Sequence, residues 1–259
     1  MYSIIGKLKT NFVFAPDGFN PVLIRNLRIQ LCYPLAFLFN QIFNLANLPD
    51  EWKHAVVSPI FKKGIASDPN NYRPISITSV FCKLFEAVIK KHMLAYLNEF
   101  SMISKDQHGF LTGHSSTTNL LECLKDWTAL LENGSCVKVL HYDFKEAFDT
   151  VSVPKLLLKL EYLGIGGNLL SCIDSFLSNR SQIVRVGHSF SESKSVISGN
   201  PQGSVLWPLL FLLYINDLPN TFDSCSRSKL FADDLKSYNT FTYCVYPKVS
   251  NDAFSAVIA

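Results

Sequence analysis

The sequence has no paired cysteines, no leader-like start and no apolar run long enough to cross a bilayer. Its seven cysteines are scattered without a C-x-x-C spacing, which argues against a zinc site or a disulfide framework and favours reduced thiols. The N-terminus lacks the regions of a signal peptide. The most apolar stretch, 205–215, contains Pro208 and is shorter than the ~20 residues of a membrane helix. We therefore expect an intracellular protein, nuclear or cytoplasmic, outside the membrane.

Internal repeats and low-complexity linkers are also absent, and the composition is that of a globular protein. The chain has 259 residues, of which 48% are hydrophobic and 20 are phenylalanine, so it can bury a core as one large domain or two small ones. The formal net charge is +3. This mild basicity permits nucleic-acid binding but does not by itself indicate it.

Two adjacent carboxylates, Asp233 and Asp234, stand between apolar residues near the C-terminal end. The pattern predicts a β-hairpin with the acids at its tip. A third carboxylate, Asp143, ends the strand-like run 137–142. Carboxylates from neighbouring strands suit hard divalent cations, and two such ions about 3.5–4 Å apart assist phosphoryl transfer. Taken alone, an Asp-Asp pair is more often a solvated turn.

Three basic residues lie on two predicted extended segments within residues 54–77. Lys62 and Lys63 follow the first segment, and Arg73 lies in the second, where Pro74 disfavours helix at the preceding residue. Arginine makes bidentate contacts with phosphate and lysine supplies point charge, so the three residues are candidates to hold a triphosphate. A solvated charged loop is the alternative.

The remaining pattern predicts helices, a further hairpin and a glycine-rich loop. In residues 199–204, glycines allow close backbone approach to a ligand, and Gln202 is placed to hydrogen-bond a sugar or base. The order of elements indicates the α+β class, with an antiparallel sheet backed by helices. The predicted helices cover residues 34–44, 79–98, 116–133, 168–177 and 204–217, and the hairpin joins 182–186 to 194–198.

Several short motifs occur together in one order. The chain resembles, over about residues 5–240, the reverse transcriptases of non-LTR (LINE-type) retrotransposons, especially the jockey-like ones. The motifs are Ala15-Pro16-Asp17-Gly18, Pro59-Ile60-Phe61-Lys62-Lys63-Gly64, Tyr72-Arg73-Pro74-Ile75-Ser76, Gln107-His108-Gly109-Phe110, Asp143 to Asp149, Pro201-Gln202-Gly203-Ser204, Tyr214-Ile215-Asn216-Asp217 and Phe231-Ala232-Asp233-Asp234.

The resemblance implies a right-handed polymerase fold of fingers and palm that copies RNA into DNA with two Mg²⁺ ions. The partners would be an RNA template, a DNA primer and dNTPs. By position, Asp143, Asp233 and Asp234 match the catalytic, metal-binding carboxylates, and the Phe144 carbonyl matches a further ligand.

The resemblance also implies a nucleotide-binding set. Phe148 matches the aromatic steric gate that excludes a 2′-hydroxyl, and Gln202 matches a residue that touches the incoming nucleotide. Arg73, with Lys62 or Lys63, matches the finger residues on the triphosphate. For Asp149, by contrast, we expect a local structural role.

The sequence departs from the family pattern in places. Trp207 stands where the family usually has glycine, which puts local packing in doubt. After about Asn239 the pattern stops, so we expect a reverse transcriptase domain at 1–240, an unrelated tail at 241–259 and a missing thumb. A chain truncated in this way is not expected to extend primers processively.

Two alternatives to the polymerase of this family remain open. A decayed, non-catalytic remnant that at most binds nucleic acid is the first. A group II intron or retron polymerase is the second, and the residues of the motifs at 143–149 and 214–217 argue against it.

Overall fold

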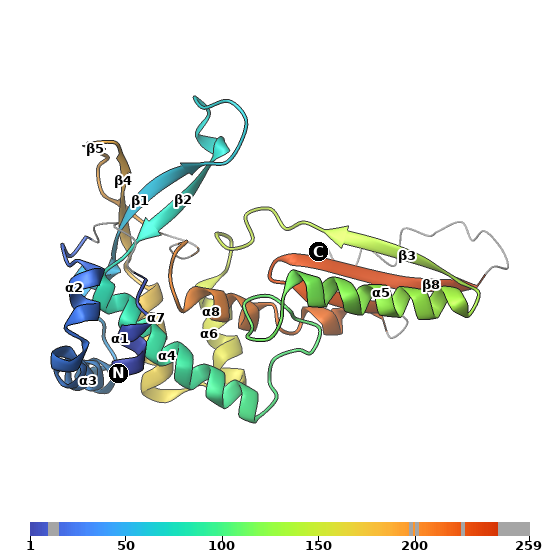
Figure 1. Cartoon of the computed structure of the whole chain (residues 1–259), viewed down its shortest axis with the longest axis horizontal. Coiled ribbons are helices and arrows are strands. Elements are labelled where there is room, and N and C mark those ends of the chain that lie inside the picture. Colours follow the sequence, from blue (N-terminus) through green and yellow to red (C-terminus); the bar gives the residue numbers. More distant parts are fainter. Residues whose placement is uncertain (10–15, 197–198, 200–201, 224–225, 243–259) are drawn as a thin grey trace. The chain divides into compact units, whose positions relative to one another are not determined.

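The chain folds into two compact units of helices and sheet (Figure 1). The first contains Met1–Met102 and Phe148–Leu213, and the second contains Ile103–Ala147 and Tyr214–Ala259. The α+β class is therefore confirmed. The predicted boundary near residue 240 stays a prediction, because nearly all of the proposed tail lies outside the described residues. The computed structural model describes residues 1–9, 16–196, 199, 202–223 and 226–242.

The sheet of the first unit is built on the two predicted extended segments. They form β1 (His54–Phe61) and β2 (Tyr72–Ile77), which pair antiparallel from Val56 opposite Ile77 to Phe61 opposite Tyr72. This hairpin confirms the prediction for residues 54–77. Its position at the sheet edge leaves the basic turn exposed.

The predicted antiparallel sheet is the one that carries the acids, in the second unit, whereas the sheet of the first unit departs from that arrangement. β4 (Ser181–Val186) runs parallel to β1, so the sheet is mixed. β4 also pairs antiparallel with β5 (Ser189–Phe190) and β6 (Lys194–Ser195). Of the predicted partner strand 194–198, residues 197–198 lie outside the described residues. The alternation of Val184, Arg185 and Val186 is typical of antiparallel strands, so nothing in the sequence indicated this parallel pairing.

Helices account for most of the first unit. The Ser79 hydroxyl accepts from the Cys82 N–H and caps α4. The rings of Phe39, Trp52 and Phe85 meet at centroid distances of 5.4–6.0 Å and form an aromatic core. The helices are α1 (Tyr2–Gly6), α2 (Pro21–Asn26), α3 (Arg28–Leu45), α4 (Val80–Glu99), α6 (Val153–Tyr162), α7 (Gly167–Leu177) and α8 (Trp207–Tyr214), with short 3₁₀ turns at Asp50–Lys53 and Pro69–Asn71.

Two of these helices differ from their predicted bounds. α3 begins at Arg28 and runs through Pro34, which was expected to start it. α8 begins at Trp207 rather than at Ser204, and the N–H groups of Val205 and Leu206 just before it donate to a side chain from α4.

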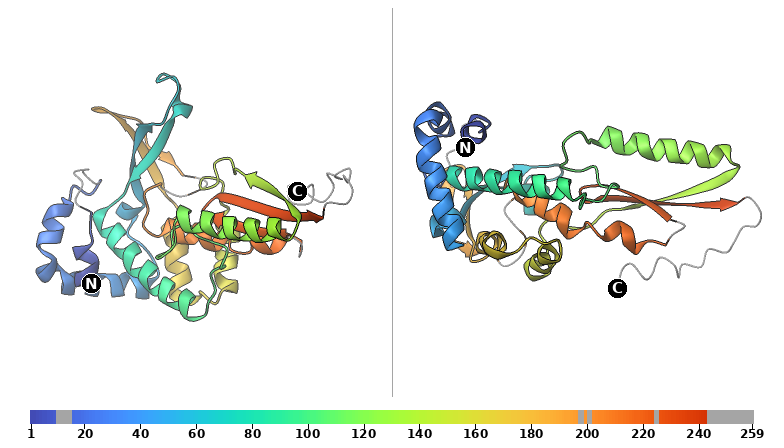
Figure 2. Two further views of the ribbon diagram at one scale, coloured as in Figure 1. Left: turned by 45° about the vertical axis from the view of Figure 1, so that its right-hand side comes forward. Right: turned by 90° about the horizontal axis from the view of Figure 1, so that it is seen from below.

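The second unit is a three-stranded antiparallel sheet with one long helix along it (Figure 2). The strand order is β3 (Ser135–Tyr142), β8 (Asp234–Thr242) and β7 (Ser226–Phe231). The helix α5 (Ser116–Glu132) starts with a capping box at Ser115 and Thr118. A short 3₁₀ turn at Leu218–Thr221 precedes β7.

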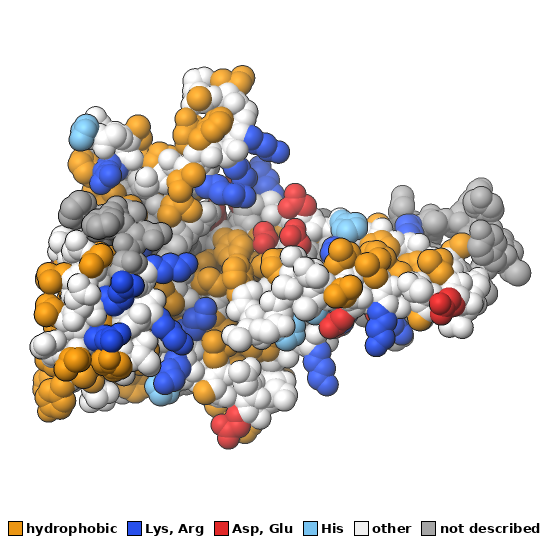
Figure 3. All heavy atoms as spheres, in the orientation of Figure 1, with side chains coloured by type: hydrophobic (Ala, Val, Ile, Leu, Met, Phe, Trp, Pro, Cys, Tyr) orange, Lys and Arg blue, Asp and Glu red, His pale blue; other side chains and the backbone are white. Residues whose placement is uncertain are grey.

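Contacts between α5 and the sheet hold this unit together. The Tyr238 hydroxyl of β8 donates to Asp126, and its ring meets Trp127 edge-on. Much of the apolar surface of α5, by contrast, faces outward: Leu120, Leu121 and Leu124 are exposed, and hydrophobic side chains gather over this helix (Figure 3). None of the helices in the described part of the chain combines the length and apolarity needed to cross a membrane.

Candidate active site

The acidic pair lies at the tip of the β7–β8 hairpin, as predicted. Phe231 pairs with Asp234, and Ala232 and Asp233 form the two-residue turn. Ala232 has a positive φ of 55°, a conformation that costs a non-glycine residue of order 1 kcal/mol. Ala232 and Leu235 are buried, whereas Asp233 is half-buried and Asp234 is exposed.

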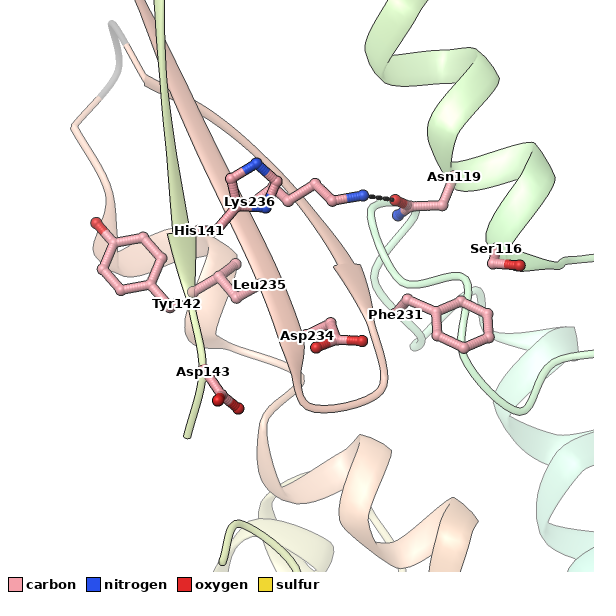
Figure 4. Close-up of a pocket in the computed structure, with 9 residues that line it drawn as sticks. All are labelled: Ser116, Asn119, His141, Tyr142, Asp143, Phe231, Asp234, Leu235 and Lys236. Atoms are coloured by element: carbon pink, nitrogen blue, oxygen red, sulfur yellow. Dashed lines mark hydrogen bonds between the residues drawn. The ribbon is translucent and has the colours of Figure 1, made fainter. Parts of the chain in front are cut away.

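Asp143 lies beside this tip on the neighbouring strand. The β3–β8 register ends with Tyr142 opposite Leu235, so one further step places Asp143 level with Asp234. Their side chains are close neighbours at this end of the sheet (Figure 4). Both line an open pocket of about 470 Å³. Its other lining residues are Ser116, Asn119, His141, Tyr142, Phe231, Leu235 and Lys236.

The electrostatic effect of the cluster is seen at Asp233. Burial raises the pKa of Asp233, and the charges of Asp234 and Asp143 raise it further, while a hydrogen bond with its own backbone opposes the shift. A like-charge cluster of this kind disfavours the ionised state until a cation is present. The donor chemistry therefore suits a hard divalent ion.

The metal site itself stays a prediction. Among the described residues, no group of three or more His, Cys, Asp or Glu side chains is arranged to hold a metal ion. Phe144, whose carbonyl was the further candidate ligand, is an exposed residue directly after Asp143.

The β1–β2 register separates the two candidate lysines. Arg73 pairs with Ile60, and the Lys62 N–H donates to the Asn71 carbonyl at 2.8 Å, which extends the ladder by one residue. Side chains alternate between faces along a strand, so Lys62 falls on the face of Ile60 and Arg73, and Lys63 does not. All three basic residues are exposed. The register favours Lys62 as the partner of Arg73.

The other nucleotide-binding candidates lie in the first unit, whereas the three aspartates belong to the second. The half-buried Phe148 ring stacks on Phe211 of α8 at a centroid distance of 4.3 Å. The Gln202 Nε2 donates to an Asp149 carboxylate oxygen at 3.2 Å, and the Gln202 carbonyl accepts from the Ser76 N–H at 2.7 Å. The first of these bonds agrees with the expected local role of Asp149.

Glu86 of α4 is a residue that the sequence analysis missed. Only 1% of it is exposed. Its carboxylate accepts from the Ser204 hydroxyl and from the N–H groups of Val205 and Leu206. This buried carboxylate fixes the entry to α8 and the end of the loop that carries Gln202. One feature of the sequence could have identified it: Glu86 is a single acidic residue among the apolar residues of the predicted helix 79–98.

Trp207, the departure from the family pattern, is accommodated inside the first unit. It is 2% exposed at the start of α8. Its indole N–H has no hydrogen-bond partner among the described residues, an omission that typically costs about 1–3 kcal/mol. The packing is thus possible but retains an unsatisfied donor.

Comparison with known proteins shows the family of the chain. The profile of the family described as "Reverse transcriptase (RNA-dependent DNA polymerase)" matches residues 60–241, and the chain belongs to this family. It is 30% identical over 215 residues to "Probable RNA-directed DNA polymerase from transposon BS" of Drosophila melanogaster, which covers 83% of this chain and 23% of that protein.

Two further relatives come from the same organism. The chain is 31% identical over 216 residues to "Probable RNA-directed DNA polymerase from transposon X-element", covering 82% of this chain and 24% of the relative. It is 31% identical over 218 residues to "RNA-directed DNA polymerase from mobile element jockey", covering 84% and 24%. The chain is a reverse transcriptase domain of the non-LTR retrotransposon type, and it spans about a quarter of the length of these relatives.

Proposed function

We propose that this chain carries the catalytic part of an RNA-directed DNA polymerase, which extends a DNA primer on an RNA template with dNTPs. The observation that carries the proposal is the placement of Asp143, Asp233 and Asp234 at one end of the β3–β8–β7 sheet, in a chain of this family. This sheet with α5 is the proposed palm, and β1, β2 and the N-terminal helices are the proposed fingers.

In the proposed reaction the primer 3′-oxygen attacks the α-phosphate of the dNTP and pyrophosphate leaves. Asp143 and Asp233 would be the main ligands of two Mg²⁺ ions, with Asp234 and the Phe144 carbonyl as further ligands. When bound, the ions would supply Lewis-acid activation of the attacking oxygen and charge stabilisation for the leaving group. The chain supplies positioning and charge rather than covalent chemistry.

The remaining candidates orient the nucleotide. Arg73 and Lys62 hold the triphosphate through charge-assisted hydrogen bonds. Phe148 lies under the sugar and excludes a 2′-hydroxyl. Gln202, which is held by Asp149 and Ser76, contacts the sugar or base of the incoming nucleotide.

Incorporation of one labelled dNTP on an RNA–DNA template–primer with Mg²⁺ tests the proposal. We expect incorporation directed by the template base, abolished by EDTA and by Asp143→Asn. A folded chain that binds the template–primer but incorporates nothing would instead be the non-catalytic remnant.

The two lysines after β1 are expected to differ in function. Lys62→Ala should raise the KM for dNTP about 10-fold or more, because a charge-assisted hydrogen bond is worth about 1.5–3 kcal/mol. Lys63→Ala, on the adjacent residue, should change it less than about 3-fold, the range of a solvated charge. Steady-state incorporation kinetics measure both. Equal effects of the two substitutions would contradict the assignment from strand register.

The steric-gate role of Phe148 predicts a change in sugar selectivity. Phe148→Val is expected to improve ribonucleotide relative to deoxyribonucleotide incorporation by about 10–10²-fold, since the steric fit of one small group in an apolar pocket is worth about 1–3 kcal/mol. Phe190→Val, at an exposed phenylalanine of the same unit, is the matched control. If Phe148→Val lowered stability with unchanged selectivity, the ring would serve only to pack against Phe211.

A further inference from the structure

The side chain of Gln107 touches the tip of the acidic hairpin, 125 residues away in the sequence. Gln107 is 3% exposed. Its Oε1 accepts from the Ala232 N–H at 2.9 Å and from the Gly109 N–H at 2.7 Å. One buried oxygen therefore satisfies two backbone donors, one of them in the two-residue turn that carries Asp233.

Backbone contacts align the Gln107 segment with β7. The Leu230 N–H donates to the Asp106 carbonyl at 2.8 Å, and the His108 N–H donates to the Leu230 carbonyl at 2.9 Å. Gln107 and Leu230 thus form a parallel bridge. This segment therefore holds the hairpin arm at Leu230, just before the turn.

Gly109 permits the close approach at the turn itself. A Cβ added at Gly109 would lie 2.3 Å from the Ala232 nitrogen and 2.8 Å from its Cα. Any side chain there would displace Ala232. Gln107 therefore supplies the acceptor for the Ala232 N–H, and Gly109, two residues later, leaves room for the Ala232 backbone.

Side chains of α5 support the same arm. The Asn119 Nδ2 donates to the Leu230 carbonyl at 3.1 Å, and the Lys236 ammonium donates to the Asn119 Oδ1 at 3.1 Å. Lys229 is paired with Asp106 and Glu122, each at 2.9 Å. These contacts hold the two strands, whereas Gln107 is the side chain that reaches the turn.

We propose that Gln107 is a positioning residue, which holds the Ala232 peptide in its left-handed conformation and thereby orients Asp233 and Asp234. The inference rests on the proposed role of these aspartates. Ala232 has a positive φ without being glycine, so the turn needs an outside interaction to hold it. An apolar side chain could fill the volume of Gln107, but only an acceptor can satisfy the two N–H groups.

Amide hydrogen exchange of Ala232, measured by NMR on the whole chain, tests the hydrogen bond directly. In Gln107→Met, of similar length but without an acceptor, exchange should rise about 10-fold or more, the equivalent of one lost buried hydrogen bond. Gln107→Glu retains a carboxyl oxygen as acceptor and should restore most of the protection. Gln107→Asn serves as a second variant in case Gln107→Met does not fold. Its side chain is shorter by one methylene, so the acceptor no longer reaches the turn, and amide exchange at Ala232 should rise as in Gln107→Met.

Divalent-ion affinity distinguishes positioning from mere stabilisation. The dissociation constant for Mn²⁺ should rise about 10-fold in Gln107→Met or Gln107→Asn, because misaligned carboxylates bind a shared ion less well. Tyr238→Phe, on β8 of the same sheet, is the matched control: it loses a hydrogen bond to Asp126 of α5 but leaves the turn intact, and should not change Mn²⁺ affinity.

Unchanged Ala232 exchange, or unchanged Mn²⁺ affinity, in the variants that lack the acceptor would overturn the proposal. Equal weakening of Mn²⁺ binding by Tyr238→Phe would also overturn it, since the effect would then follow general stability. Failure of the proposed function is a separate result, because it appears as absent nucleotide incorporation by the unaltered chain.

Discussion

Asp233→Asn is expected to lower single-nucleotide incorporation about 10³-fold, with the affinity for template–primer nearly unchanged. Asparagine keeps the shape of the side chain but removes the charge. Loss of one preorganised electrostatic group at a reacting centre typically costs about 10²–10³-fold in rate, and Asp233 is the half-buried member of the acidic cluster. Rapid-quench incorporation and a filter-binding assay measure the two quantities.

The control for this substitution is Asp223→Asn, at an exposed aspartate of the same unit. It should leave the rate within about 2-fold, as is usual for an exposed charge. If Asp233→Asn incorporated nucleotide at a rate within 10-fold of the original, Asp233 would not be a catalytic residue.

Glu86→Ala is expected to lower the free energy of unfolding by about 3–5 kcal/mol, because it leaves three donors unsatisfied and each unsatisfied buried polar group costs about 1–3 kcal/mol. The substitution leaves the Ser204 hydroxyl and the N–H groups of Val205 and Leu206 without their acceptor. Urea denaturation, followed through the fluorescence of the neighbouring Trp207, measures the change.

Glu99→Ala is the matched control, because Glu99 is an exposed glutamate at the end of the same helix. Its effect should stay within about 0.5 kcal/mol. A loss below about 1 kcal/mol in Glu86→Ala would show that water replaces the carboxylate at the start of α8.

Local signals were enough to predict the elements on which the site is built. Ser79 caps α4 and Ser115 caps α5, and both helices agree with their predicted bounds to within one residue. The acids at 233 and 234 were predicted at a hairpin tip because apolar residues flank them, and the β7–β8 register confirms that placement.

Long-range pairings could not be predicted in the same way. The parallel pairing of His54 with Ser181 is invisible in the alternation of either strand. The bond from Ala232 to Gln107 and the bonds around Glu86 join residues more than 100 positions apart. Each of these contacts depends on which elements pack against each other in the fold, and the spacing of residues within one element does not determine that packing.

The lysine pair shows an intermediate case. Both Lys62 and Lys63 remained candidates from the sequence, because the pattern gave no register for the β1–β2 hairpin. Once Ile60 is paired with Arg73, the period of two assigns Lys62 to the face of Arg73. The β1–β2 register therefore indicates which of the two lysines lies on the face of Arg73, which composition and charge alone do not show.

Mn²⁺ titration of the whole chain most directly tests the proposal that Asp143, Asp233 and Asp234 form one divalent-metal site. Amide NMR signals near the paramagnetic ion broaden selectively. The account predicts broadening of residues 142–144 and 232–235 together at low Mn²⁺ concentration, with loss of the effect in Asp143→Asn and in Asp233→Asn. Broadening of only one of these segments, or equal broadening in the substituted chains, would contradict it.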